Sequence, residues 1–213
     1  YVSWSARSTD GKPHNVSLYF DATGEWVVNT VDQDVVWGRY NVGDLTVLRM
    51  GSKEQPVLAK AGDNLRIDWG YLTLAVPRQS KGSTIMASDR AARESFIASG
   101  TLGDTDDLRM PRPARDDWPV LATVFDLGEV TDKAVSRYLM LAYDDEHSIE
   151  YHREKLRPYW RRDGMETPAL LRLAEKDYPA LSEKCRTFDE ELMADLTKAG
   201  GERYAKLCAL AYR

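Results

Sequence analysis

Short segments in which apolar and polar residues alternate, separated by frequent turn residues, fill the first two thirds of this 213-residue chain. Val16, Leu18 and Phe20 alternate with more polar neighbours, which is the pattern of a strand that buries one face. Turn residues such as Asn41 and Gly43 follow at short intervals. Because the strands are short and turns separate them, the pattern predicts a mainly β fold, an antiparallel β-sandwich, rather than alternating strands and helices.

The same criteria place the other elements of this region. The longest strand pattern covers residues 65–76, with a bulge or bend expected at Gly70. The one helix is expected at residues 88–99, with Asp89 as a possible cap and Gly100 as its end. The remaining strands are expected at residues 25–28, 35–37, 45–50, 120–127 and 135–143, with an acidic loop at residues 104–119.

After the last predicted strand the chain becomes helical in character. Thr167 and Pro168 suit the N-cap and first position of one helix. Pro179 is expected to begin a second helix with a single apolar stripe. The Gly-Gly pair at residues 200–201 is expected to end that helix, and a third helix is expected over residues 202–213.

The predicted organisation is a sandwich over residues 1–145 and a helical arm over residues 146–213. Two short helices and a third that runs to the end of the chain cannot enclose a core. We therefore expect them to pack on the sandwich or on a helical domain that follows in a longer protein. Without that domain, their apolar faces are expected either to stay exposed or to be covered by a second copy in a homodimer. The residues expected at this domain interface are Phe188, Leu192, Tyr204 and Leu207.

Composition and charge argue against two classes of partner. The formal net charge of −5 argues against a nucleic-acid surface, which needs a basic stripe. No stretch approaches the ~18 consecutive apolar residues of a membrane-spanning helix. The only cysteines, Cys185 and Cys208, lie on apolar faces of the helical arm. They are expected to be buried free thiols, with a disulfide between neighbouring helices as the alternative.

Known catalytic motifs are absent from the sequence. It contains no phosphate-binding loop, no dinucleotide fingerprint, no Gly-x-Ser-x-Gly elbow and no His-Glu-x-x-His, so we expect no catalytic residue, metal or cofactor in this chain. His147 and His152 are five residues apart, and their side chains diverge on a strand or a helix. Acidic residues at 104–107 and 143–146 suggest calcium but lack the EF-hand pattern, and they are expected to be solvated turns.

One cluster mixes aromatic rings with guanidinium groups, a mixture that suits sugars, aromatic rings or carboxylates. It lies at the junction between the predicted sandwich and the helical arm, where such side chains also serve as an interface plug. The predicted binding residues in this cluster are Arg157, Tyr159 and Trp160.

The first strand region resembles a pattern of the glutaminase A family of bacteria and fungi. Residues 10–26 read DGKPHNVSLYFDATGEW, which is similar to the family pattern DGK.H.VQLYFD.SGEW. Further matches occur in the same order along the chain, at residues 65–71, 117–128, 139–144, 188–192 and 200–213.

This resemblance implies a secreted or periplasmic protein in which a β-sandwich precedes a helical (α/α) barrel of the six-hairpin-glycosidase type. It also implies hydrolysis of L-glutamine to glutamate and ammonia, with catalysis in the barrel. The expected function is therefore a non-catalytic N-terminal sandwich that packs on that barrel and supports it. The alternative is a carbohydrate-binding accessory sandwich of a glycan-processing enzyme, which an exposed, coplanar pair of tryptophans would favour.

Overall fold

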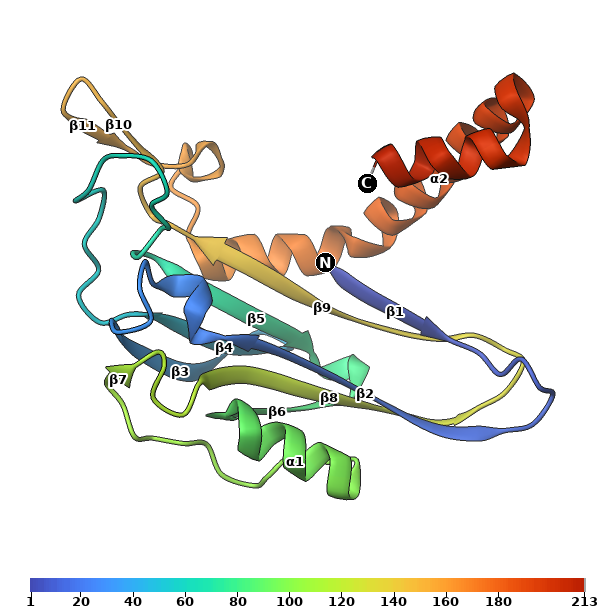
Figure 1. Ribbon diagram of the computed structural model, residues 1–213, viewed down its shortest axis with the longest axis horizontal. Helices are drawn as coiled ribbons and strands as arrows, with labels where there is room; N and C mark the ends of the chain where they lie inside the picture. The colour runs from blue at the N-terminus through green and yellow to red at the C-terminus, as the bar shows by residue number, and fades with distance from the viewer. Residues whose placement is uncertain (213) are drawn as a thin grey trace. The chain divides into compact units, whose positions relative to one another are not determined.

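The computed structural model describes residues 1–212, and its main body is an antiparallel β-sandwich (Figure 1). A six-stranded sheet has the order β1-β9-β5-β4-β3-β7, a three-stranded sheet has the order β2-β8-β6, and β10 and β11 form a separate hairpin. The predicted fold class is confirmed. The strands are β1 (Val2–Ala6), β2 (His14–Thr23), β3 (Asp34–Val42), β4 (Leu45–Ser52), β5 (Tyr71–Pro77), β6 (Gly82–Ser88), β7 (Arg112–Pro113), β8 (Pro119–Val130), β9 (Val135–Asp144), β10 (Ile149–Tyr151) and β11 (Glu154–Leu156). The helices are η1 (Gly24–Val27), η2 (Arg78–Ser80), α1 (Asp89–Ser99), η3 (Tyr159–Arg161) and α2 (Thr167–Tyr212).

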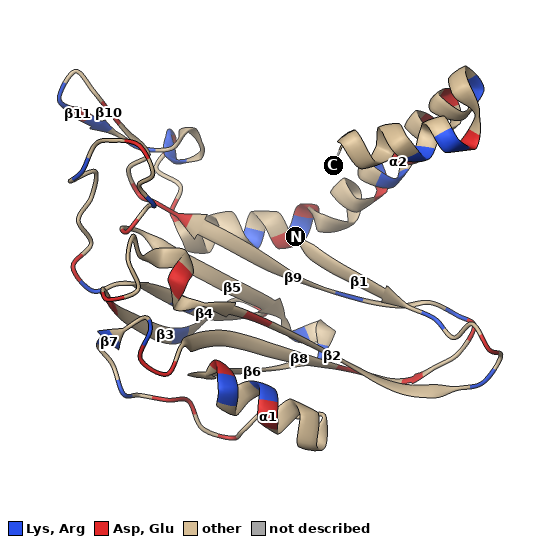
Figure 2. Cartoon of the chain, in the orientation of Figure 1, with Lys and Arg blue, Asp and Glu red and all other residues tan. Residues whose placement is uncertain are grey.

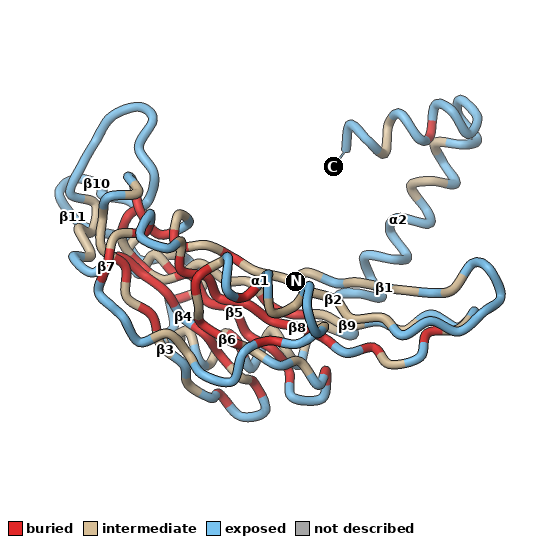
Figure 3. The backbone as a smooth tube through the Cα atoms, turned by 60° about the horizontal axis from the view of Figure 1, so that its bottom comes forward, coloured by how far each residue is buried: buried red, intermediate tan, exposed pale blue. Residues whose placement is uncertain are grey.

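The core lies between the two sheets, and Figure 3 shows the buried backbone concentrated in their strands. The large sheet contributes Leu48 and Leu74, and the small sheet contributes Leu121 and Phe125; all four are 0% exposed. Trp4 packs on Phe125 with the ring centroids 5.9 Å apart. Alternation along the strands brings these side chains to the inner faces, as the period-two pattern predicts.

Helix α1 covers the outer face of the three-stranded sheet, where Phe96 packs on Tyr19 at a centroid distance of 5.2 Å. Its N-cap is Ser88, whose hydroxyl accepts a hydrogen bond from the Ala91 N–H at 3.1 Å. The expected cap, Asp89, is instead the first helical residue, because the serine side chain one position earlier fills the capping role. Gly100 ends the helix with φ 72°, as predicted.

Two predicted strand segments are not strands. Residues 25–28 overlap the 3-10 helix η1 and leave Trp26 57% exposed. In residues 65–70, side chains form the backbone hydrogen bonds that a neighbouring strand would otherwise form. The Gln55 carboxamide accepts a hydrogen bond from the Gly70 N–H at 2.6 Å and donates one to the Gly70 C=O at 3.1 Å. Backbone groups satisfied in this way need no neighbouring strand. The prediction also missed the strands β1, β6, β7, β10 and β11.

Helix α2 does not break at Pro179, which lies inside it, contrary to the prediction. Proline removes one helical hydrogen bond, but the surrounding residues are mostly strong helix formers such as Ala, Leu, Glu and Lys, which carry the helix past it. The helix is interrupted at Gly201, with φ 78° and ψ 176°, as predicted for the Gly-Gly pair at residues 200–201. No helix in the described residues is long and apolar enough to cross a membrane.

The chain divides into two compact units, Tyr1–Leu171 and Arg172–Arg213, and each is described by itself. In the second unit the chain turns back at Gly201, so that Phe188 and Tyr212 face each other with ring centroids 5.9 Å apart. Ala205 is fully buried. Cys185 is exposed and Cys208 is half-buried, both as free thiols, so the expectation of two buried thiols is wrong because the apolar stripe is largely uncovered.

Candidate functional site

A cavity of about 480 Å³ lies on the outer face of the six-stranded sheet. Leu48 and Leu74 point into the core, so their neighbours Arg49 and Thr73 point to the opposite, outer face. All the lining residues belong to the first unit. They are residues 36–40 of β3, Arg49 of β4, Tyr71 and Thr73 of β5, Asp144 and Glu146 at the end of β9, and Arg161 with residues 166–168.

Strand register builds the floor of the cavity. Gly38, Arg49 and Thr73 are direct cross-strand neighbours on β3, β4 and β5. A side chain at Gly38 would find open space, because nothing lies within 4 Å of its would-be Cβ. A Cβ at Gly51, in contrast, would lie 2.6 Å from the Tyr71 ring. The two glycines therefore hollow the surface and allow the tyrosine ring to lie close against the sheet.

Arg49 brings an unbalanced positive charge to this floor. It is the only charged residue in β4 and β5, in a sandwich whose charges otherwise gather mainly in loops, helices and strand ends (Figure 2). Its guanidinium carbon lies 3.9 Å from the centroid of the Tyr71 ring, a cation–π contact. Among residues 1–212 no carboxylate forms an ion pair with it, and the side chain is exposed to solvent.

A buried ion pair forms one wall of the cavity. Asp144 accepts hydrogen bonds from Arg161 and from the Thr167 hydroxyl, and Arg161 also pairs with Glu166. The side chains of Arg161 and Asp144 are only 4% and 7% exposed. Burial by itself raises the pKa of Asp144, but the hydrogen bonds from Arg161 and Thr167 outweigh it and hold that pKa below its usual value. Asp144 is thus an ionised, fully paired carboxylate and a poor general base.

Tyr40 supplies a hydroxyl at the cavity. Burial raises the pKa of Tyr40, while Arg49 and Thr73 oppose that increase. The phenol therefore stays protonated at neutral pH and can donate a hydrogen bond.

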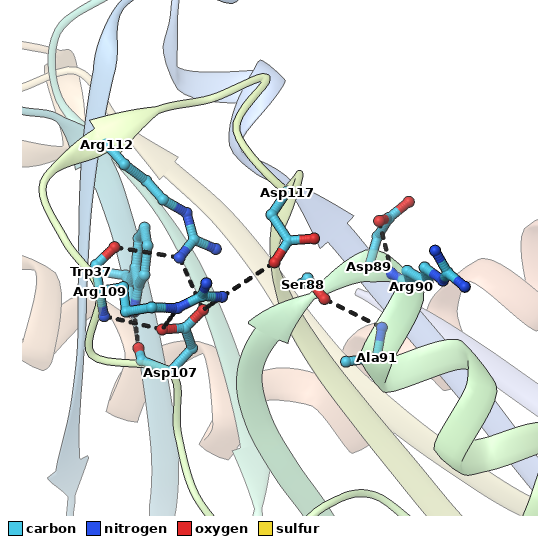
Figure 4. A network of polar contacts seen from close by, with 9 residues as sticks. All are labelled: Trp37, Ser88, Asp89, Arg90, Ala91, Asp107, Arg109, Arg112 and Asp117. Atoms are coloured by element: carbon cyan, nitrogen blue, oxygen red, sulfur yellow. Dashed lines mark hydrogen bonds and ion pairs between the residues drawn. The ribbon is translucent and has the colours of Figure 1, made fainter.

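The acidic loop after α1 binds arginines instead of forming the expected solvated turns. Asp107 accepts hydrogen bonds from Arg109 and Arg112, and its backbone carbonyl accepts from the Trp37 indole at 2.7 Å (Figure 4). The Arg109 hydrogen bonds hold the pKa of Asp107 well below its usual range. Asp106 pairs with Arg39 at 2.8 Å in the same way. Within residues 1–212 no group of three or more acidic, histidine or cysteine side chains is placed to hold a metal ion.

The predicted junction cluster lies beside the cavity without lining it. Tyr159 is 79% exposed and carries Arg162 over its ring at 4.0 Å. Arg157 contacts Glu166 at 3.4 Å, and Trp160 lies under Arg161 at 4.5 Å. The cluster's role in binding therefore stays a prediction, and the residue of this segment that enters the cavity is Arg161.

The predicted domain-interface residues all lie in the second unit and leave apolar surface uncovered. Phe188 is 46% exposed, Tyr204 is 45% exposed and Leu207 is 66% exposed, while Leu192 is half-buried. Nothing in the described residues shows what meets them, and their role at an interface stays a prediction.

Arg49 was missed although its sequence carries a signal. It is a single charge inside an otherwise uncharged strand, Leu45-Thr46-Val47-Leu48-Arg49-Met50, on the face opposite Leu48 and Met50. Such a residue either lies on a solvated face or marks a site. The partners Tyr71, Asp144 and Arg161 are distant in sequence, and no local pattern joins them.

Comparison with known proteins places this fold in a family. The family described as a domain of unknown function, DUF5127, matches residues 1–195. The chain belongs to the DUF5127 family. This DUF5127 chain is 26% identical over 219 residues to glutaminase A of Aspergillus oryzae, and the match covers all of the chain but 31% of that protein. It is 22% identical over 220 residues to a probable glutaminase of Arthroderma benhamiae, covering 93% of the chain and 25% of that protein.

The resemblance to the glutaminase A family seen in the sequence is confirmed by these matches. The chain spans less than a third of the length of either relative. The larger part of each relative therefore has no counterpart in this chain.

Proposed function

We propose that this DUF5127 chain is a non-catalytic accessory sandwich that supports the catalytic part of a larger L-glutamine amidohydrolase. The observation that carries the proposal is the coverage: the whole chain matches glutaminase A, yet it accounts for 31% of that protein. Of the carboxylates at the cavity, Glu146 alone has no ion pair among the described residues, while the buried Asp144 is already paired with Arg161 and Thr167. A carboxylate held in this way offers a hydrolase neither a nucleophile nor a free base.

The second unit supports the view that a helical domain follows. Its two helices leave large apolar side chains uncovered, with Leu207 66% exposed and Leu210 75% exposed. Exposed apolar patches of this kind usually mark an interaction surface. We propose that the uncovered faces pack on further helices of the catalytic domain, of the (α/α)-barrel type, and that the protein acts outside the cytoplasm, as a secreted or periplasmic protein.

The carbohydrate-binding alternative requires an exposed, coplanar pair of tryptophans, and the described residues contain none. Of the six tryptophans, all in the described residues, only Trp26 is exposed; Trp37 is buried and the other four are half-buried. Sugar-binding sandwiches of the expected kind present exposed rings to stack on the sugar, and a single exposed indole beside η1 is no coplanar pair. The structure thus favours the supporting role.

The test measures ammonia release from L-glutamine by three preparations: a protein extended through the following region, this chain alone, and the following region alone. We expect activity in the extended protein and none in this chain. Ammonia release by this chain that a single substitution such as Glu146→Gln abolishes would contradict the proposal. A glycan panel run on the same preparations tests the alternative, and the presence of the intact protein in the culture medium or periplasmic fraction tests the location.

A further inference from the structure

Positive charge in the outer-face cavity is balanced everywhere except at Arg49. The Arg161 guanidinium pairs with Asp144 and Glu166. Arg39 of β3 points its guanidinium to the opposite face of the sheet, where it binds Thr84 of β6 and Asp106. Arg49 has the Tyr71 ring as its close partner and no ion pair with a carboxylate of the described residues. Its planar group therefore remains available to an incoming anion.

The Arg49 side chain is held in one place by its neighbours. The Tyr71 ring supports the guanidinium at 3.9 Å, and Gly51 lets that ring lie against the sheet. A guanidinium held on an aromatic ring loses less conformational freedom when it binds. Its fork of N–H donors matches a carboxylate bidentately.

The space beside Arg49 suits a small molecule. Gly38, its direct neighbour on β3, leaves open space above the strand, and the cavity of about 480 Å³ is of a size usual for small-molecule sites. The Tyr40 hydroxyl adds a hydrogen-bond donor, and Glu146 adds a carboxylate without an ion-pair partner among the described residues. A sugar platform fits less well, because Arg49 already covers a face of the Tyr71 ring.

We propose that this cavity binds a small organic carboxylate of about amino-acid size, with the carboxylate on the Arg49 guanidinium and the body of the molecule over Gly38. Glu146 is placed at the same cavity and would favour a ligand that also carries an ammonium group. The site goes beyond the supporting role proposed above, since it concerns binding by this chain and not hydrolysis.

The test is calorimetric titration of the 213-residue chain with L-glutamate, with glutarate, which lacks the ammonium group, and with glucose. We expect saturable millimolar binding of the two carboxylates, weaker in high salt, and none of glucose. Tighter binding of glutamate than of glutarate, lost in Glu146→Gln, identifies an amino acid as the preferred class. Equal binding identifies a simple carboxylate.

Two variants test the charge of Arg49 and the open space above Gly38 separately. Arg49→Gln removes the charge and is expected to weaken binding at least about tenfold, by analogy with other charge-assisted pairs. Gly38→Val keeps the charge and fills the hollow, at a position where a Cβ meets nothing within 4 Å, so it is expected to fold and to weaken binding as well. Arg90→Gln, on the exposed face of α1, is the control that leaves binding unchanged.

Three outcomes would overturn the proposal: no saturable binding of either carboxylate, equal affinity in the wild type and Arg49→Gln, or glucose binding as tightly as glutamate. Circular dichroism and melting of each variant show whether it is folded. Because binding is read on this chain without any catalytic assay, a negative result leaves the supporting role untouched. Glutamine hydrolysis by this chain alone would overturn the supporting role and leave the binding result intact.

Discussion

At the scale of single residues, several aspartates of this protein bind arginines and thereby fix the course of the chain. Asp106 and Asp144 are each bound by an arginine from another segment, Arg39 and Arg161, while Asp107 is bound by Arg109 and Arg112 of its own loop. An arginine that binds a carboxylate from a distant segment fixes where that segment runs, because the paired geometry admits little variation. These acids therefore hold the loop after α1 and the segment after β9 in place.

We expect Asp144→Ala to lower the free energy of unfolding by about 3–5 kcal/mol, because it takes away the buried partner of the Arg161 guanidinium and leaves only the exposed Glu166. Urea denaturation measures the change. The matched control is Arg90→Ala, which breaks the exposed pair with Glu94, whose side chains are 79% and 65% exposed, and is expected to cost less than about 1 kcal/mol. Equal costs for the two variants would contradict the view that burial decides the strength of these pairs.

At the scale of elements, the sequence predicted those features that depend on neighbouring residues in the chain. The end of α1 at Gly100 was predictable because a positive φ there suits glycine. The segment 65–70 was not, because its backbone is satisfied by the Gln55 side chain, and no periodicity contains that information. The cavity was equally hidden, since it depends on β9 pairing with β5, which brings Asp144 beside Tyr71.

The cap of α1 provides a test at this scale. Ser88→Ala removes the acceptor of the Ala91 N–H and is expected to lower the free energy of unfolding by about 1 kcal/mol. Ser95→Ala, the same change inside the helix, is expected to be neutral or slightly stabilising because alanine is the better helix former. Thermal melting of both variants measures the difference. A Ser88→Ala protein as stable as the wild type would show that another group caps the helix.

For the whole molecule, the uncovered helical faces lead us to expect that the 213-residue chain associates with itself at high concentration. Each leucine buried in such a contact is worth about 1.5–3 kcal/mol, and Leu207 and Leu210 are 66% and 75% exposed. Light scattering after gel filtration should give a mass that rises with concentration. The double variant Leu207→Glu/Leu210→Glu is expected to be monomeric, with Lys206→Glu as the control. A wild-type mass equal to that of a single chain at every concentration would argue against self-association through this surface.

The position of β8 and β9 in the two sheets has a consequence for how the protein is made. Each is paired on both sides, β8 with β2 and β6, and β9 with β1 and β5. On the ribosome, β1 and β2 emerge before the other strands of the sandwich, and their partners emerge only after residue 118. At a synthesis rate of about 5–20 residues per second, β2 waits roughly 5–20 s for β8. During that interval the β3-β4-β5 meander can pair, and the short β7 can join β3, but β1 and β2 remain open to wrong partners. We therefore expect a chaperone that binds unfolded chains to improve the folding yield of this protein most during that interval.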